Sequence, residues 1–109
     1  MSFETILYEE DGPIGWITLN RPDAGNMFNV TMCHELRDCM NAIRRETRTR
    51  VVVLTGAGDR FFCIGGEKTG MEETLLYPGV LPTLEIYESI ERLQKPVIAS
   101  VNGYAVGGG

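Results

Sequence analysis

The sequence predicts an α/β fold, in which strands alternate with helices, and three observations support this prediction. Residues 51–55 form an apolar, β-branched run without a polar interruption, which is typical of a parallel strand buried on both faces. Residues 30–47 and 82–94 show the spacing of apolar side chains found in amphipathic helices. Residues 97–101 form a second apolar run directly after the second helix. Strands and helices that alternate in this way are characteristic of α/β domains.

The N-terminal region is expected to form two strands, at residues 3–10 and 14–20. The Asp11-Gly12-Pro13 segment between them contains both of the strongest turn formers, glycine and proline. In the second strand, Ile17 and Leu19 lie two positions apart and therefore share one face. This alternation predicts a strand with two distinct faces.

The first helix is expected over residues 30–47. Asn29 is a good N-cap, because its side-chain oxygen can accept a hydrogen bond from a free N–H group of the first turn. Arginines cluster at the other end, where cations suit the helix dipole. The predicted buried face comprises Met32, Leu36, Cys39 or Met40, and Ile43.

The second helix is expected over residues 82–94. Glu88 and Arg92 are spaced i,i+4, which predicts an ion pair along the helix. The side chains expected to point inward are Leu84, Tyr87, Ile90 and Leu93.

Composition limits the chain to one domain at most and excludes several functions. The chain has 109 residues and a formal net charge of −5, which argues against nucleic-acid binding as the main role. Its apolar runs are too short to span a bilayer, so no membrane association is expected. Its three cysteines form no Cys-x-x-Cys pair, and no secretion signal is visible. We therefore expect a cytoplasmic protein without a disulfide framework and without a metal site.

Two glycine-rich segments carry the candidate chemistry. Gly65 and Gly66 follow the apolar residues 61–64, and three glycines at 107–109 follow the strand at 97–101. Because glycine has no Cβ, the backbone there can come within hydrogen-bonding distance of a ligand oxygen. The same residues also suit a turn that needs a positive φ, and their spacing matches neither a phosphate-binding GxxxxGK[ST] loop nor GxGxxG. The residues alone leave both interpretations of Gly65 and Gly66 open.

Four segments, in order along the chain, resemble the crotonase superfamily of enoyl-CoA hydratases, isomerases and their relatives. They are Leu19-Asn20-Arg21-Pro22 with Asn26-Met27-Phe28, then Val51-Val52-Val53-Leu54-Thr55-Gly56, then Phe62-Cys63-Ile64-Gly65-Gly66-Glu67, and finally Lys95-Pro96-Val97-Ile98-Ala99 with Asn102-Gly103-Tyr104-Ala105 and the glycine triplet. The resemblance implies a crotonase-like spiral of ββα units. Because family members are longer, residues 1–109 are expected to be the N-terminal part of a single such domain, truncated after the glycine triplet. The full-length protein is expected to be a homotrimer or hexamer, as is usual in the family.

The resemblance also implies a substrate, an acyl-CoA thioester, with coenzyme A as part of that substrate and no separate cofactor. The expected catalytic groups are the backbone N–H groups of Gly66 and Gly108, which would form an oxyanion hole for the thioester oxygen as it becomes enolate-like. One such donor is worth on the order of 3 kcal/mol in a transition state. The default chemistry is hydration or isomerisation of an enoyl-CoA. The residues expected to bind the substrate are Ala24, Ile64, Gly65, Glu67, Lys68 and Tyr77.

Two departures leave the reaction itself open. Ala24 stands where the family often has a lysine near the CoA phosphates, and the acid and base carboxylates of hydratases would lie beyond Gly109. The 109-residue chain alone is therefore expected to be inactive. The Gly65-Gly66-Glu67 triplet and Leu81-Pro82 are also similar to dihydroxynaphthoyl-CoA synthases and 2-ketocyclohexanecarboxyl-CoA hydrolases, which form or open rings. A non-catalytic interaction domain that keeps the fold is the alternative from a different functional class.

Overall fold

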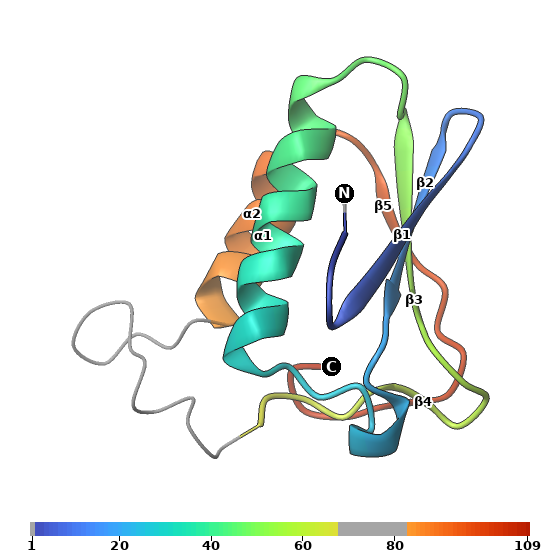
Figure 1. Cartoon of the computed structure of the whole chain (residues 1–109), viewed down its shortest axis with the longest axis vertical. Coiled ribbons are helices and arrows are strands. Elements are labelled where there is room, and N and C mark those ends of the chain that lie inside the picture. The colour runs from blue at the N-terminus through green and yellow to red at the C-terminus, as the bar shows by residue number, and fades with distance from the viewer. Residues whose placement is uncertain (1, 68–82) are drawn as a thin grey trace.

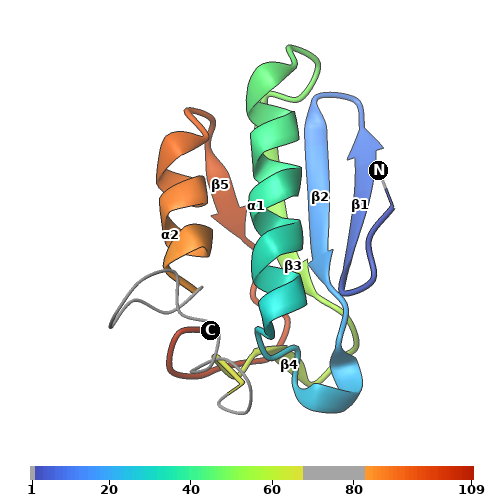
Figure 2. The same cartoon turned by 60° about the vertical axis from the view of Figure 1, so that its left-hand side comes forward.

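A four-stranded sheet with two helices packed side by side on one face forms the body of the chain (Figures 1 and 2). The computed structural model describes residues 2–67 and 83–109. The strands follow the order β1-β2-β3-β5; β1 and β2 are antiparallel, whereas β2, β3 and β5 are parallel. This arrangement confirms the predicted α/β fold. The elements of the two layers are β1 (Ile6–Asp11), β2 (Ile14–Leu19), α1 (Val30–Arg45), β3 (Val51–Gly56), α2 (Thr83–Arg92) and β5 (Val97–Ala99).

Three shorter elements lie at the end of the sheet where β3 finishes (Figure 1). Strands β4 (Phe61–Cys63) and β6 (Tyr104–Ala105) pair in parallel as a separate two-stranded sheet. A 3-10 helix, η1 (Pro22–Ala24), follows β2. The sequence did not predict β6 or its pairing with β4, because a strand of two residues has no periodicity to detect.

Several element boundaries differ from the prediction for local physical reasons. Strand β1 begins at Ile6 rather than at residue 3, because the N–H groups of Glu4 and Thr5 donate to the Glu35 carboxylate of α1 instead of entering the sheet. Helix α2 ends at Arg92, and Gln94 has a φ of +60°, which cannot continue a right-handed helix. Strand β5 ends at Ala99, two residues earlier than expected.

The predicted core of the first helix is confirmed. Asn29 caps α1 by accepting a hydrogen bond from the N–H of Met32 at 2.8 Å. On the facing strand, Ile17 and Leu19 are both buried, as their alternation predicted. The buried side chains of α1 are Met32, Cys33, Leu36, Cys39, Met40 and Ile43.

The prediction for the second helix is partly wrong. As predicted, Leu93 is buried and Ile90 packs against the core, but Tyr87 is 42% exposed and Ile86, which was not predicted, is buried. Helix α2 packs against α1, and its buried residues are Ile86 and the small Ser89. The expected ion pair between Glu88 and Arg92 is present, at 3.5 Å.

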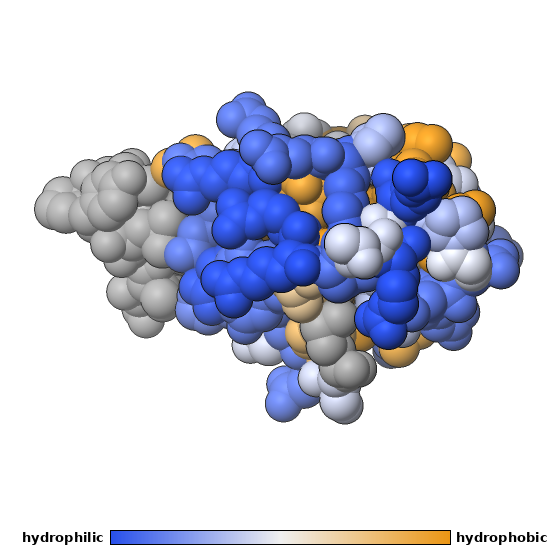
Figure 3. All heavy atoms as spheres, turned by 90° about the horizontal axis from the view of Figure 1, so that it is seen from above, coloured by the Kyte–Doolittle hydropathy of each residue, from blue (hydrophilic) through white to orange (hydrophobic). Residues whose placement is uncertain are grey.

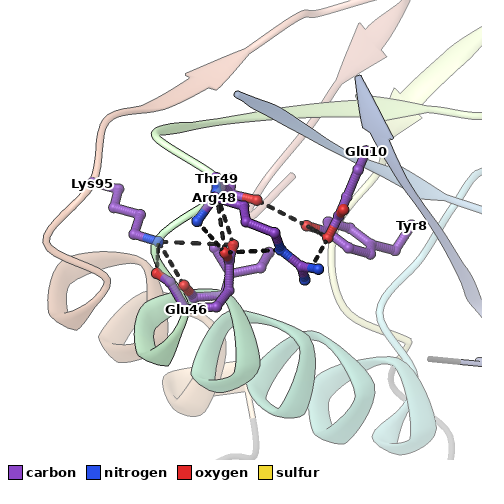
Figure 4. A network of polar contacts seen from close by, with 7 residues as sticks. Tyr8, Glu10, Glu46, Arg48, Thr49 and Lys95 are labelled. Atoms are coloured by element: carbon purple, nitrogen blue, oxygen red, sulfur yellow. Dashed lines mark hydrogen bonds and ion pairs between the residues drawn. The ribbon is translucent and has the colours of Figure 1, made fainter. Parts of the chain in front are cut away.

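The end of the molecule where α1 finishes carries a largely hydrophilic surface (Figure 3). There the Glu46 carboxylate accepts hydrogen bonds from the backbone N–H groups of Thr49 at 3.0 Å and Arg48 at 2.5 Å (Figure 4). The Thr49 hydroxyl lies 3.3 Å from the Tyr8 hydroxyl, and Arg48 pairs with Glu10 at 3.3 Å. This network ties the end of α1 to strand β1. Within the two described ranges, no helix has the length and apolar character needed to cross a membrane.

Candidate active site

The short strand β4 brings the two glycine-rich segments to the same place. Gly65 and Gly66 follow β4 directly, and the N–H of Val106 donates to the Cys63 carbonyl at its end, at 3.0 Å. A Cβ on Gly65 would lie 3.3 Å from the Val106 carbonyl oxygen and 3.6 Å from the Gly108 nitrogen. The segments that carry the predicted donors, which are more than 40 residues apart in sequence, therefore lie side by side.

Gly65 forms the turn after β4, and the N–H of Gly66 has no acceptor among the described residues. Gly65 has a φ of +105°, so the expectation of a positive φ at this pair is correct for Gly65. Its carbonyl accepts from the N–H of Phe28 at 2.9 Å, and the N–H of Glu67 donates to the Phe28 carbonyl at 2.8 Å. This bridge does not use the N–H of Gly66. Among the residues that the structure describes, the N–H groups of Gly66 and Gly108 have no hydrogen-bond acceptor.

An apolar pocket of about 160 Å³ lies beside the second glycine segment. Helix α2 contributes the partly exposed Tyr87, and the hydroxyl of this residue is 2.6 Å from the point where a Cβ on Gly108 would be. An apolar group attached to a hydrogen-bond-accepting oxygen would suit such walls next to a free N–H. The residues that line the pocket are Leu19, Phe28, Leu36, Met40, Leu54, Phe62, Ile86, Tyr87, Ile90, Ala99, Gly108 and Gly109.

A larger hollow, of about 260 Å³, lies between α1 and α2 but offers different chemistry. Four of its charged side chains are paired, since Arg37 contacts Glu85 at 3.0 Å and Arg92 contacts Glu88 at 3.5 Å, and Arg44 also lines it. Neither glycine segment lines this hollow, whereas Gly108 and Gly109 line the apolar pocket, which is therefore the better candidate site.

The loop that precedes α1 holds the first glycine segment through hydrogen bonds and an ion pair. The Arg21 guanidinium donates to the Met27 carbonyl at 2.7 Å and pairs with the Glu67 carboxylate at 3.2 Å. Glu67 thereby anchors the loop, with its carboxylate engaged by Arg21. The N–H of Ile64 donates to the Gly25 carbonyl at 3.1 Å. The arrangement fixes the backbone on both sides of Gly66.

The structure collects most of the predicted site residues around this loop. Ala24 ends η1, next to Gly25, and its N–H donates to the Arg21 carbonyl at 2.9 Å. Ile64, Gly65 and Glu67 surround Gly66. Lys68 and Tyr77, which were also expected to bind substrate, lie outside the described residues.

Sequence reasoning missed Asn26, Phe28 and Tyr87. Asn26 is fully buried and has a φ of +55°. Asparagine is one of the few non-glycine residues that adopt this left-handed conformation, which is the only local signal that could have identified it. Phe28 and Tyr87 read as ordinary core residues, and only the fold shows that Phe28 bridges to Gly66 and that Tyr87 lies beside Gly108.

Nucleophilic catalysis by the nearby thiol does not fit the site. Cys63 is buried, and burial raises the pKa of its thiol, so the reactive thiolate is disfavoured. Within residues 2–67 and 83–109, no three His, Cys, Asp or Glu side chains come together as metal ligands. Among the described residues, the backbone N–H groups are therefore the best candidates for contact with a substrate oxygen in this pocket.

Comparison with known proteins identifies the family of the chain. Residues 9–109 match the enoyl-CoA hydratase/isomerase family. The whole chain is 34% identical to 43% of a short-chain-enoyl-CoA hydratase of Clostridium acetobutylicum and 36% identical to 42% of a probable enoyl-CoA hydratase of Rhizobium meliloti. The chain thus spans less than half the length of these relatives.

Solved structures show the same fold. An enoyl-CoA hydratase from Bacillus anthracis superimposes with a TM-score of 0.76 over 92% of this chain and 40% of its own, at 28% identity. An enoyl-CoA hydratase/isomerase from Mycobacterium paratuberculosis gives a TM-score of 0.75 over 94% of this chain and 39% of its own, at 36% identity. The chain belongs to the enoyl-CoA hydratase/isomerase family of the crotonase superfamily.

Proposed function

We propose that this chain forms the thioester-binding part of an enzyme that hydrates or isomerises enoyl-CoA substrates. The observation that carries the proposal is the placement of Gly66 and Gly108 in adjacent segments, each with an N–H that has no acceptor among the described residues, with Gly108 lining an apolar pocket. Two such donors would stabilise the negative charge that develops on a thioester oxygen. Each is worth on the order of 3 kcal/mol in the transition state.

The shape and lining of the pocket support an arrangement of the substrate. The apolar walls beside Gly108 would take the acyl chain, because burying apolar surface is favourable and these walls offer few polar partners. The loop that contains Ala24 and residues 64–67 would lie against the coenzyme A portion. Ala24 has no charged side chain, so contact there would use backbone groups. The acid and base that complete the reaction are expected downstream of Gly109.

Substitution of Gly66 tests the donor directly, in the protein expressed from its complete gene. Gly66→Pro removes the N–H, whereas Gly66→Ala keeps it. A Cβ at Gly66 would lie 3.8 Å from Cγ2 of Thr83, an ordinary contact, so Gly66→Ala is a matched control. We expect the proline variant to lose about a hundredfold in kcat on crotonyl-CoA and the alanine variant to stay near wild type.

A second measurement tests thioester recognition independently of turnover. Calorimetry is expected to show tighter binding of an acyl-CoA thioester than of the free acid. The ¹³C resonance of the bound thioester carbonyl is expected to shift downfield in wild type and less in Gly66→Pro, because a hydrogen bond polarises the carbonyl. Absence of acyl-CoA binding, or full activity in a folded Gly66→Pro protein, would overturn the proposal.

A further inference from the structure

We propose that Asn26 and Asn102 are positioning residues that hold the two glycine segments in register; this inference rests on the proposed function. Both side-chain amides donate to one acceptor, the carbonyl oxygen of Phe61, at 3.0 Å from Asn26 and 3.1 Å from Asn102. Phe61 is the first residue of β4, the strand to which both glycine segments are attached. The two asparagines therefore hold the same carbonyl group, at the start of β4.

Asn26 fixes the support beneath the first donor. Its Oδ1 accepts from the N–H of Arg21 at 2.9 Å, and its Nδ2 also donates to the Ala57 carbonyl at 3.2 Å. These bonds close the loop of residues 21–27 and join it to the turn after β3. The residue two positions later, Phe28, forms the bridge to Gly66, so the conformation of this loop sets the direction of the Gly66 N–H.

Asn102 holds the start of the segment that leads to the second donor, Gly108. Its Oδ1 accepts from the N–H of Gly56 at 3.0 Å, and its Nδ2 also donates to the Gly58 carbonyl at 3.1 Å. From Asn102 the chain runs through β6, beside β4, to Gly108. Release of this amide would free the start of that segment from the end of β3.

Both positions need a side chain that accepts and donates at the same time. An amide does so, whereas an ionised carboxylate of the same shape only accepts. Displacement of a catalytic donor by about 1 Å costs on the order of a hundredfold in rate. We therefore expect loss of either amide to lower kcat while KM changes little, because the pocket and the coenzyme A contacts remain.

The decisive variant is Asn102→Asp in the protein expressed from its complete gene. Asn102 is partly exposed, so its replacement is tolerated better than that of the fully buried Asn26. The aspartate keeps the acceptor for Gly56 but loses both donors when ionised. We expect kcat at pH 7 to fall at least about tenfold, with KM within about threefold of wild type. As the pH falls and the aspartic acid gains its proton, one donor returns, so the ratio of variant to wild-type kcat is expected to rise.

Two controls separate positioning from a general loss of stability. Asn102→Ala removes all three bonds and is expected to lower kcat without the rise at low pH. Asn41→Asp makes the same chemical change on α1, away from β4, and is expected to leave kcat unchanged.

A readout without substrate distinguishes this inference from the proposed function. In Asn102→Asp, the ¹⁵N–¹H resonances of both Gly66 and Gly108 are expected to shift, although Gly66 has no direct contact with residue 102 among the described residues. If these resonances stay in place, or kcat is unchanged in the folded variant, the inference is wrong. If they shift but the wild-type protein binds no acyl-CoA thioester, the positioning role stands and the proposed function fails.

Discussion

The ammonium group of Lys95 lies 2.6 Å from the carbonyl oxygen of Ile43, in the last turn of α1 (Figure 4). It also donates to the carbonyl oxygen of Glu46 at 2.8 Å. The last carbonyls of a helix have no partner within the helix, and a cation there also suits the helix dipole. Lys95 comes two residues before β5, so it joins the end of α1 to the start of an edge strand.

Lys95→Met is expected to lower the free energy of unfolding by about 1–2 kcal/mol, because the methionine keeps the apolar stem but loses the charge and both hydrogen bonds. Urea unfolding followed by circular dichroism measures this change. Arg50→Met is the control, because Arg50 is exposed and its side chain has no contact with another charged group of the described residues. Equal unfolding midpoints for the two variants would contradict the capping role.

Glu46 is expected to make stability depend on pH in the acid range. Hydrogen bonding from Thr49, followed by the backbone N–H of Arg48 and the charge of Lys95, lowers the pKa of its carboxyl from 4.5 to about 2. Because the folded state favours the ionised form, this stabilisation is complete above pH 4.5 and is lost as the pH falls towards 2. The difference in unfolding free energy between wild type and Glu46→Gln should therefore shrink between pH 5 and pH 2.5. A difference that stays constant over this range would show that the Glu46 charge is not involved.

Gly108→Pro is expected to lower kcat at least about a hundredfold with a modest change in thioester affinity, because it removes the second donor. The structure shows that Gly108→Ala alone is not a suitable control for this variant. Gly108→Ala alone would place a methyl group 2.6 Å from the Tyr87 hydroxyl. The matched control is therefore Gly108→Ala combined with Tyr87→Phe, which keeps the N–H and removes that clash. Near wild-type kcat in a folded Gly108→Pro protein would exclude Gly108 as a donor.

Residues 1–109 expressed alone are expected to be inactive and to self-associate through β5. Ile98 of this edge strand is 53% exposed and Val101, just after it, is 57% exposed. Exposed apolar edge strands recruit other chains, and a lysine blocks that pairing. Size-exclusion chromatography should show that Ile98→Lys reduces association. The same change at Leu7, which is 47% exposed on the opposite edge strand, should have little effect, because the acidic residues at positions 9–11 already protect that strand from pairing. A monodisperse wild-type monomer would contradict this expectation.

Prediction from sequence succeeded where one local pattern decides the structure. Helix α1 has both a capping residue and apolar side chains on one face, and β3 is a continuous apolar run, so both were predicted within one or two residues. The face of α2 was harder to predict. Ile86 and Tyr87 are adjacent and both apolar enough to be buried, and contact with α1 decided between them.

The candidate site was predictable only in part, for the same reason. The glycines at 65–66 and 107–109 were visible because glycine has a distinctive conformational role. The support around them depends on hydrogen bonds over long sequence distances, such as that from Asn26 to Phe61, 35 residues away. No pattern within a short window encodes that bond. For this reason β6 and the hydrogen-bonding roles of both asparagines became visible only in the fold.

The attachment of both glycine segments to β4 has a dynamic consequence. Because both segments are attached to this strand, we expect its thermal motion to move the two N–H groups together, so that the distance between them varies less than the distance of either from α2. Helix α2, which provides Tyr87 on the far wall of the pocket, is not fastened to that strand by any hydrogen bond among the described residues. If the pocket takes the acyl chain as proposed, we expect acyl groups of different bulk to be accommodated by displacement of α2 while the spacing of the two N–H groups stays constant.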